Sequence, residues 1–306
     1  MRIGIDLGGS KIEGILLDDA GAESGRERVA TPQGDYTATL QAISRLVNKL
    51  EKQAGVGCSV GIGMPGTRSR CTGRVKNSNS VCLNGQPLFH DLESLLGRTL
   101  RFANDADCFA LSEASDGAAA GADTVFGVIV GTGTGGGIVC RGHLLSGPNG
   151  IAGEWGHNPL PWPLADELPG PACYCGKQGC IETWLSGPGL ARDHEAQSGD
   201  AMDAASIAQA AASGATAART TLHRYADRMA RALASVINVI DPDVIVLGGG
   251  ISNIEWLYSA VPQRWGKYVF SDAVETRLVR ALHGDASGVR GAAWLWSDQV
   301  CIRSPG

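Results

Sequence analysis

Three cysteines within eight residues are the chemically most specific feature of the sequence. They are Cys173, Cys175 and Cys180, and the glycines at 176 and 179 let the loop wrap around an ion. His157 lies 16 positions before the first cysteine. Three thiolates and one imidazole make a closed tetrahedral zinc shell that leaves no position for water. The spacing predicts a structural zinc ion and argues against a zinc-dependent hydrolase. The alternative is a set of incidental buried cysteines beside a core histidine.

Three glycine clusters each follow an apolar run that is typical of a strand, at residues 8–9, 131–137 and 248–250. A turn without side chains can aim backbone N–H groups at phosphate oxygens, although each cluster alone also fits a tight hairpin or a helix start. A P-loop is excluded because its lysine-containing motif does not occur. A dinucleotide site is disfavoured because more strand follows the second cluster. Asp6 would hold magnesium through water, and Lys11 would add positive charge.

A carboxylate at the junction of a predicted strand and a predicted helix, Asp105, is the candidate general base. Phosphoryl transfer to an alcohol needs a carboxylate that accepts the hydroxyl proton. Aspartate is also a common helix N-cap, and the position of Asp105 by itself favours that role. The residues alone therefore leave both roles open.

The elements that must position these residues follow an alternating α/β pattern. Helical spacing of apolar residues predicts helices, and short apolar runs predict strands. The order strand, glycine turn, strand at the start of the chain recurs near residue 124, which suggests two related halves with a hinge near residue 115. Helices are expected over 35–53, 106–116 and 218–240, with another opened by residues 248–250, and strands over 2–6, 12–17, 59–64, 74–77, 99–103, 124–130 and 244–247.

Composition is typical of a globular protein. The chain has 306 residues, of which 43% are hydrophobic and 19% charged, enough for one large or two medium domains. The net charge of -5 gives no sign of nucleic acid or an anionic membrane as a partner. No leader pattern or membrane-spanning apolar run is present, so a soluble, cytoplasmic protein is expected. Nine cysteines in that reducing compartment argue against a disulfide framework.

In their order along the chain, these motifs resemble the ROK family of bacterial sugar kinases. The resemblance covers the chain to about residue 296, and the tail after Trp296 resembles nothing known. Ser10 stands where threonine is usual and keeps the hydroxyl group. The matching stretches are Asp6 to Lys11, Gly63 to Gly66, Asn104 to Asp107, Gly131 to Gly137, Glu154 to His157, Cys173 to Glu182 and Gly248 to Gly250.

Within the family, residues 75–80, 84–87, 153–162 and 283–294 are most similar to bacterial manno(fructo)kinases. The resemblance implies ATP-dependent phosphorylation of a hexose, with D-fructose first. The alternatives are an N-acetylglucosamine kinase, whose motifs are similar, or a broad hexokinase acting on mannose or glucose.

The resemblance also implies an actin-like, hexokinase-type (ribonuclease H-like) α/β fold in which two domains flank a cleft. The expected domains are residues 1–115, to which a C-terminal helix at about 289–300 returns, and residues 116–288, which carry the zinc motif. A hexose and ATP are the expected partners, and a homodimer is the usual assembly of the family.

By the same resemblance, Asp105 would activate the sugar hydroxyl. His157 would bind the sugar through one ring nitrogen and zinc through the other, which fixes its tautomer. The zinc ligands would be His157, Cys173, Cys175 and Cys180. The other sugar contacts would be Gly66, Asn79, Asn104, Glu154 and Glu182. ATP with its Mg²⁺ would contact Asp6, Gly8, Gly9, Ser10, Lys11, Gly131, Thr132, Gly133, Thr134, Gly135, Gly136, Gly249 and Gly250.

A sugar-responsive protein without catalytic activity is the competing class. Repressors of the family carry a helix-turn-helix domain ahead of the kinase-like part, and the first predicted strand here begins at residue 2. Retention of Asp105 together with the phosphate-binding glycines disfavours a non-catalytic sugar-binding regulator. An assay for ADP release distinguishes the two classes.

Overall fold

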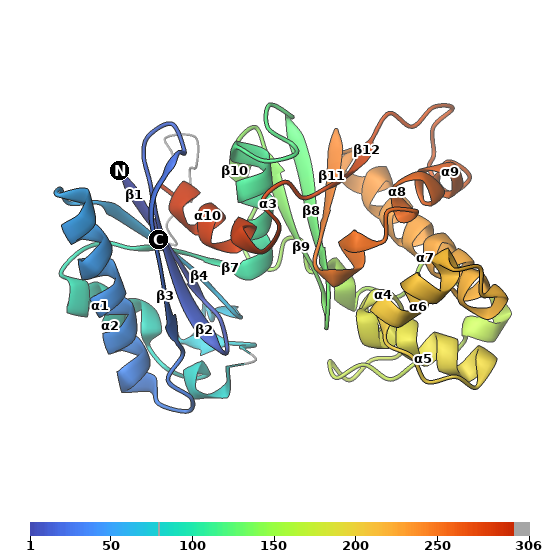
Figure 1. Cartoon of the computed structure of the whole chain (residues 1–306), viewed down its shortest axis with the longest axis horizontal. Coiled ribbons are helices and arrows are strands. Elements are labelled where there is room, and N and C mark those ends of the chain that lie inside the picture. Colours follow the sequence, from blue (N-terminus) through green and yellow to red (C-terminus); the bar gives the residue numbers. More distant parts are fainter. Residues whose placement is uncertain (79, 297–306) are drawn as a thin grey trace. The chain divides into compact units, whose positions relative to one another are not determined.

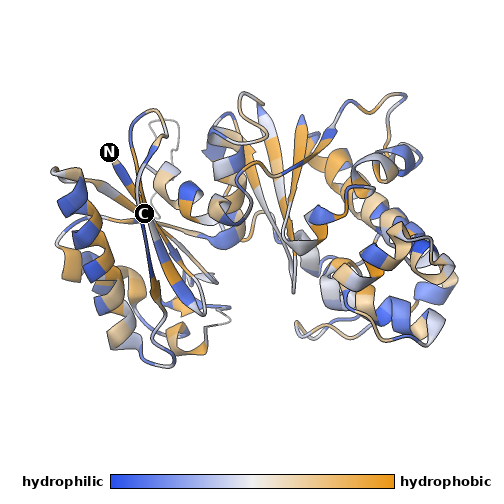
Figure 2. Ribbon diagram, in the orientation of Figure 1, coloured by the Kyte–Doolittle hydropathy of each residue, from blue (hydrophilic) through white to orange (hydrophobic). Residues whose placement is uncertain are grey.

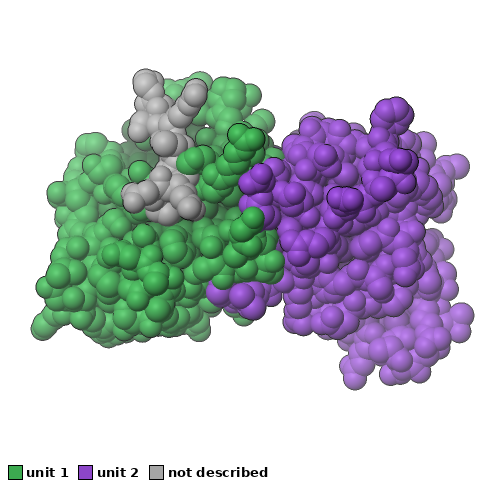
Figure 3. Space-filling model, turned by 90° about the horizontal axis from the view of Figure 1, so that it is seen from above, with its two compact units in different colours: residues 1–121, 137–152, 285–306 green, residues 122–136, 153–284 purple. Residues whose placement is uncertain are grey.

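The computed structural model describes residues 1–78 and 80–296 and divides into two compact units (Figure 1, Figure 3). The first unit contains residues 1–121, 137–152 and those from 285 onward; the second contains residues 122–136 and 153–284. Asn79, one of the predicted sugar contacts, lies outside the described residues, as does the tail after Trp296.

A five-stranded sheet with the order β3-β2-β1-β4-β7 forms the centre of the first unit. β1, β4 and β7 run parallel, while β2 and β3 extend the sheet as antiparallel neighbours. The carboxyl ends of the three parallel strands therefore share one edge. The strands are β1 (Arg2–Leu7), β2 (Lys11–Leu17), β3 (Glu23–Ala30), β4 (Ser59–Met64) and β7 (Arg101–Asn104), with a small hairpin of β5 (Thr67–Arg68) and β6 (Val75–Lys76) beside them.

Helices cover both faces of this sheet (Figure 1). α1 (Tyr36–Ala54) and α2 (Leu88–Leu96) pack together, and α1 lies against β1, β2 and β3. α1 buries Ile43, Leu46 and Leu50 at helical spacing, against Ile3 and Ile5 of β1. α3 (Asp105–Ser115) and α10 (Ser287–Trp294) pack together, and α10 lies against β1 and β4. Figure 2 shows the hydrophobic residues concentrated along the strands.

Glycine allows α10 to approach its neighbours at backbone distance. A Cβ atom at Gly61 of β4 would lie 1.9 Å from the carbonyl oxygen of Ala292. A Cβ atom at Gly291 would lie 1.7 Å from the carbonyl oxygen of Cys108 in α3. The helix is therefore seated on the sheet and on α3 without intervening side chains. It ends at Trp294, and residues 297–300 of the expected C-terminal helix lie outside the described residues.

The second unit is built on β8, β11 and β12, which are parallel. The sheet order is β10-β9-β8-β11-β12, and β9 passes at Gly137 from the second unit into residues of the first. The longest helix, α7, packs against α5, α6 and α9. The remaining elements are β8 (Thr124–Val130), β9 (Thr134–Cys140), β10 (His143–Leu144), α4 (Ile181–Leu185), α5 (Gly187–Ser198), α6 (Ala204–Ala212), α7 (Thr216–Ile240), β11 (Val244–Gly248), α8 (Leu257–Ala260), α9 (Pro262–Trp265) and β12 (Arg277–Arg280).

A buried ion-pair network ties the segment before the cysteine motif to α7. Glu167 accepts hydrogen bonds from Arg228 (Nε, 2.7 Å) and Arg231 (Nη2, 2.8 Å), and all three side chains are buried. Burial alone would raise the pKa of Glu167, but the hydrogen bonds from Arg231 and Arg228 outweigh it and lower the pKa to about 2. The segment leading to Cys173 is thus fixed to the longest helix of the unit.

Apart from the C-terminal helix and the helix expected after residues 248–250, the strands and helices expected from the sequence are present, with ends that differ by at most two residues. The expectation that Gly248–Gly250 opens a helix is wrong, because only a 3₁₀ turn, η4 (Gly250–Asn253), follows β11. β3, whose side chains are mostly exposed, and α2 are among the elements that were not expected from the sequence, as are α4, α5, α6 and β12. No helix among the described residues is long and apolar enough to cross a membrane.

The close seating of α10 predicts that Gly291→Ala destabilises the protein. The added methyl group would overlap the backbone of α3, and overpacking of this kind costs about 1–3 kcal/mol or more. Gly57→Ala is the matched control, because a Cβ atom added there would have nothing within 4 Å and the backbone φ is ordinary. Urea unfolding midpoints measure both variants. Equal midpoints for Gly291→Ala and the wild type would contradict the seating.

Candidate active site

Three predicted site segments lie side by side at the carboxyl edge of the first sheet. β1 ends beside Asp6, β4 at Met64 and β7 at Asn104. Asp6 is in register with Gly63, and Met64 with Asn104. Ligand sites of parallel α/β sheets form outside the carboxyl ends of their strands. The first unit therefore gathers Asp6, the turn Gly8–Lys11, Gly66 and Asp105 at one edge.

Asp105 is the first residue of α3 and does not cap it. The N-cap is Asn104, whose side-chain oxygen accepts a hydrogen bond from the N–H of Asp107 at 2.6 Å. Among the described residues, the Asp105 carboxylate accepts hydrogen bonds only from N–H groups at the start of α3, that of Ala106 at 2.9 Å and its own. The interpretation of Asp105 as a helix cap is therefore wrong, and its carboxylate is available for other chemistry.

The environment of Asp105 favours proton uptake. Burial raises the pKa of this carboxyl above the usual value for aspartate, while the N–H of Ala106 and its own N–H oppose the rise. Asp105 is nevertheless exposed at the surface, so a hydroxyl group can reach its carboxylate. A carboxylate of raised pKa at a solvent-accessible sheet edge is suited to accept a proton from an alcohol.

Asp6 is a second acidic group at the same edge. Burial raises its pKa to about 6, and the negative charges of Asp105 and Glu13 add to the rise, while Lys11 opposes it. Two neighbouring carboxylates of this kind favour a divalent cation, which would relieve their repulsion. The donor set therefore fits magnesium.

Lys11 is paired within the protein. Its ammonium group lies 3.3 Å from a carboxylate oxygen of Glu13, which also binds Arg26 and Arg28. Glu13 was not singled out from the sequence, because two of its three partners, Arg26 and Arg28, come from the neighbouring strand β3. The positive charge expected from Lys11 is thus shared with this cluster.

Gly66 has a backbone conformation that only glycine adopts easily. Its φ is +82°, and a Cβ atom would lie 2.5 Å from the carbonyl oxygen of Lys76. Asn84, which the sequence analysis did not assign to the site, accepts from the N–H of Ser78 (2.9 Å) and donates to its carbonyl (2.7 Å). Asn84 therefore holds the segment that leads to the predicted sugar contact at residue 79.

In the second unit, Glu182 is connected directly to the glycine turn between β8 and β9. The N–H of Thr134 donates to the Glu182 carboxylate at 2.9 Å, and a Cβ atom at Gly133 would lie 2.7 Å from the same oxygen. The N–H of Thr134, predicted to bind phosphate, is therefore engaged by a protein carboxylate. The turn residues Gly131–Thr134 and the predicted sugar contact Glu182 form one connected structure.

The segment Glu154–His157 is fixed on the start of β9. The indole N–H of Trp155 donates to the carbonyl of Gly135 at 3.1 Å, and its ring meets Phe126 edge-on at 5.5 Å. A Cβ atom at Gly156 would lie 2.2 Å from the carbonyl oxygen of Thr134. This contact fixes the 3₁₀ turn η2 (Trp155–His157), which carries the imidazole next to the cysteine loop.

The four predicted metal ligands come together in the second unit. The ligand atoms of His157, Cys173, Cys175 and Cys180 all lie within 4.8 Å of one another. Sγ of Cys173 is 3.6 Å from Nδ1 of His157, and Sγ of Cys175 is 3.6 Å from Sγ of Cys180. Bond lengths of about 2.3 Å for sulfur and about 2.1 Å for nitrogen give ligand separations of about 3.5–3.8 Å around a tetrahedral ion. The geometry and the donor chemistry therefore fit zinc.

His157 turns its other ring nitrogen, Nε2, toward the hydroxyl of Tyr174, at 2.9 Å. Tyr174 lies between two of the cysteines and is largely exposed, and the sequence analysis gave it no role. With Nδ1 facing the cysteines, Nε2 is the nitrogen that remains for a hydroxyl group.

Gly249 joins the ends of two parallel strands. Its φ is +79°, and a Cβ atom would lie 2.4 Å from the carbonyl oxygen of Val130, the last residue of β8. The turns after β8 and β11, both predicted to contact ATP, therefore meet at one edge of the second sheet.

The chain is similar over most of its length to known sugar kinases. The chain is 41% identical over 299 residues to an N-acetyl-D-glucosamine kinase of Photobacterium profundum, covering 96% of this chain and 99% of that protein. A crystal structure of a ROK hexokinase from Thermus thermophilus matches with a TM-score of 0.85 at 32% identity, covering 96% of both chains. A ROK family glucokinase from Streptomyces griseus, in complex with glucose and AMPPNP, matches with a TM-score of 0.75 at 27% identity, covering 96% of this chain and 98% of that one.

These likenesses confirm the expected hexokinase-type α/β fold. The ROK family model matches residues 2–299, which is almost the whole sequence. The chain therefore belongs to the ROK family.

Proposed function

We propose that the protein transfers the γ-phosphoryl group of ATP to a hydroxyl group of a hexose, with Asp105 as the general base. The observation that carries this proposal is the position of Asp105 at the carboxyl edge of the first sheet. At this edge Asp105 does not cap α3, and the pKa of its carboxyl is raised. Its negative charge also raises the pKa of Asp6, so the two carboxylates lie close together. Membership of the ROK family and similarity to sugar kinases support the same function.

In the proposed reaction, a sugar oxygen forms a bond to the γ-phosphorus as the bond to the β-phosphate oxygen breaks. Asp105 accepts the proton of the attacking hydroxyl group, so that charge does not accumulate on the sugar oxygen. Asp6 would hold magnesium, which when bound neutralises phosphate charge. Glu182 and His157 would orient the sugar, and the glycine turns would hold the nucleotide.

N-acetylglucosamine is the substrate that the relatives favour. The 41% identical protein from Photobacterium profundum is an N-acetyl-D-glucosamine kinase. D-Fructose remains the second candidate, because residues 153–162 and 283–294 resemble manno(fructo)kinases. Mannose or glucose would indicate a broad hexokinase, and the expected homodimer stays a prediction.

We also propose that His157, Cys173, Cys175 and Cys180 hold a structural zinc ion. Four protein donors fill the tetrahedral shell, so the ion would fix the loop rather than take part in the reaction. Through Nδ1 it would fix the tautomer and the direction of the His157 ring, leaving Nε2 for a sugar hydroxyl in place of the Tyr174 hydroxyl.

Asp105→Asn is expected to lower kcat by about 10²-fold or more, because the amide cannot accept the proton. The wild type should lose activity on acidification at a higher pH than an ordinary aspartate would produce, since protonation of a group of raised pKa removes the base. A coupled ADP-release assay across pH measures both effects. Asp203→Asn, which retains an acceptor at the N-cap of α6, is the control. Near-normal turnover by Asp105→Asn would eliminate Asp105 as the base.

A panel of sugars with MgATP tests the choice of substrate. We expect kcat/KM to be highest for N-acetylglucosamine, with fructose, mannose and glucose as comparison sugars. A preference for fructose of tenfold or more, equivalent to about 1.4 kcal/mol, would reverse the order of the two candidates. No ADP release with any hexose would reject the kinase and favour a non-catalytic sugar-binding protein.

Purified protein is expected to contain about one zinc ion per chain, and Cys175→Ser is expected to lose both the ion and stability. Metal analysis and thermal unfolding measure these quantities. Cys71→Ser is the control, because Cys71 is also exposed but lies outside the ligand cluster. Protein that folds stably with no zinc would disprove the site.

A further inference from the structure

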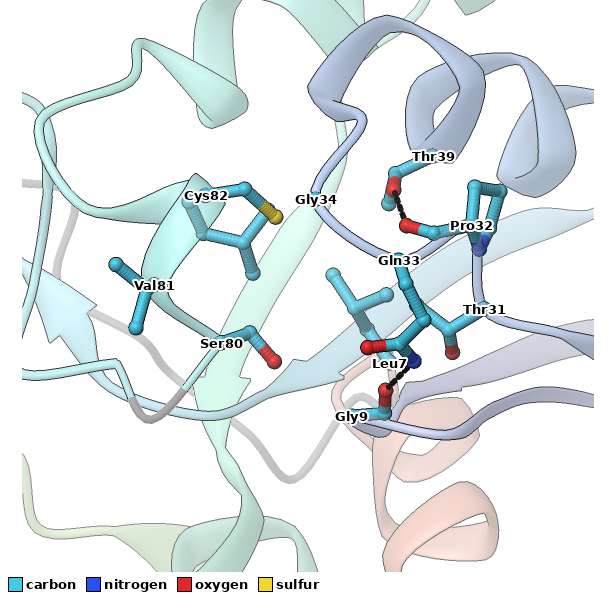
Figure 4. Close-up of a pocket in the computed structure, with 11 residues that line it drawn as sticks. Leu7, Gly9, Thr31, Pro32, Gln33, Gly34, Thr39, Ser80, Val81 and Cys82 are labelled. Atoms are coloured by element: carbon cyan, nitrogen blue, oxygen red, sulfur yellow. Dashed lines mark hydrogen bonds between the residues drawn. The ribbon is translucent and has the colours of Figure 1, made fainter.

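The carbonyl groups of the turn between β1 and β2 are held by the segment Thr31–Gln33. The Thr31 hydroxyl donates to the carbonyl of Gly8 at 2.7 Å. Nε2 of Gln33 donates to the carbonyl of Gly9 at 2.6 Å, as Figure 4 shows. The backbone N–H of Thr31 donates to the carbonyl of Ser10 at 3.0 Å. All three carbonyls of the turn thus have partners on one segment, which we call the carbonyl clamp.

Peptide planarity determines what the clamp does to the N–H groups. The C=O and N–H of a trans peptide point in opposite directions. Because the clamp receives the carbonyls of Gly8 and Gly9, the N–H groups of Gly9 and Ser10 point away from it. Among residues 1–78 and 80–296, no protein group accepts a hydrogen bond from either of these N–H groups. Adjacent free amides in a turn suit an oxyanion such as phosphate.

The glycines make such a clamp necessary. Gly8 and Gly9 restrict φ and ψ little, so the peptide planes of an unsupported turn can flip. A flipped plane would present a carbonyl oxygen, with partial negative charge, to the phosphate. Hydrogen bonds to the carbonyls oppose this flip without touching the ligand.

The clamp is anchored on α1 and faces open space on its other side. The buried Thr39 donates its hydroxyl to the carbonyl of Asp35 at 2.8 Å and lies within 3.5 Å of the carbonyl of Pro32. A cavity of about 450 Å³ separates the clamp from residues 80–83 (Figure 4). Gln33 is exposed, so its replacement changes a hydrogen bond without opening the core.

We infer that Thr31 and Gln33 are positioning residues that aim the N–H groups of Gly9 and Ser10 at the phosphates of a nucleoside triphosphate. The inference rests on the proposed function, and neither residue touches the nucleotide itself. The two side chains act through the carbonyls, and their contribution should therefore appear in nucleotide affinity rather than in sugar affinity.

The double variant Thr31→Val, Gln33→Leu tests the clamp. Without these two hydrogen bonds the turn no longer holds its N–H groups toward the phosphates, so the KM for MgATP should rise about tenfold or more. The KM for the sugar should stay close to that of the wild type, and thermal unfolding checks that the variant is folded. The single variant Thr31→Ser keeps the hydroxyl group and should therefore bind MgATP about as tightly as the wild type.

Two substitutions elsewhere serve as controls. Gln53→Leu removes an exposed side-chain hydrogen bond to Glu27, and Thr220→Val removes a hydroxyl bond to the carbonyl of Thr216 on α7. Neither should change either KM. If the folded double variant had an unchanged KM for MgATP, the positioning role of Thr31 and Gln33 would be rejected. Equal increases in the KM for MgATP and the KM for the sugar would reject it as well.

Calorimetric binding of a non-hydrolysable MgATP analogue separates this inference from the proposed kinase activity. A wild type that binds the analogue but phosphorylates no hexose would reject the kinase. The clamp would still be supported if the double variant bound the analogue about tenfold more weakly. A wild type that does not bind the analogue would overturn the clamp.

Discussion

The structure depends on backbone segments that approach one another too closely for any side chain to fit between them. In the first unit, Gly61 and Gly291 let α10 lie directly on β4 and α3. In the second, Gly249 lies against the end of β8, and Gly156 lies against Thr134. These contacts determine where the strand ends and turns lie. The positions of the candidate site residues follow from them, since those residues sit on the same strand ends and turns.

The glycine turns after β1 and β8 expose many backbone N–H and C=O groups, and only some of these groups form hydrogen bonds within the protein. In the turn after β1, the carbonyls have protein partners while the N–H groups of Gly9 and Ser10 have none among the residues that the structure describes. In the turn after β8, the N–H of Thr134 goes to Glu182 instead. Gly9 and Ser10 are exposed, so their N–H groups can bind water and remain available to a ligand. The two turns, which look alike in sequence, therefore differ in what they offer to a phosphate.

The acidic side chains near the edge of the first sheet differ in whether they are paired with cations. Asp6 and Asp105 are carboxylates of raised pKa, whereas Glu13 is surrounded by Lys11, Arg26 and Arg28. Burial would raise the pKa of Glu13, but its hydrogen bonds to these cations outweigh burial and lower it. The cations thus stabilise Glu13, and the acidic pair is left to bind a metal ion or a proton.

The sequence by itself determined the features that depend on local spacing. The cluster of His157 and three cysteines, the glycine turns and the principal strands and helices were predicted from residues close together in the chain, and the resemblance they carry led to the family. Only the tertiary structure decided that Asn104 rather than Asp105 caps α3, that Lys11 pairs with Glu13 and that Thr134 donates to Glu182. It also brought Thr31 and Gln33 to the turn at Gly8. These pairings join residues of different elements, and their geometry is fixed by packing, which hydrophobic periodicity does not encode.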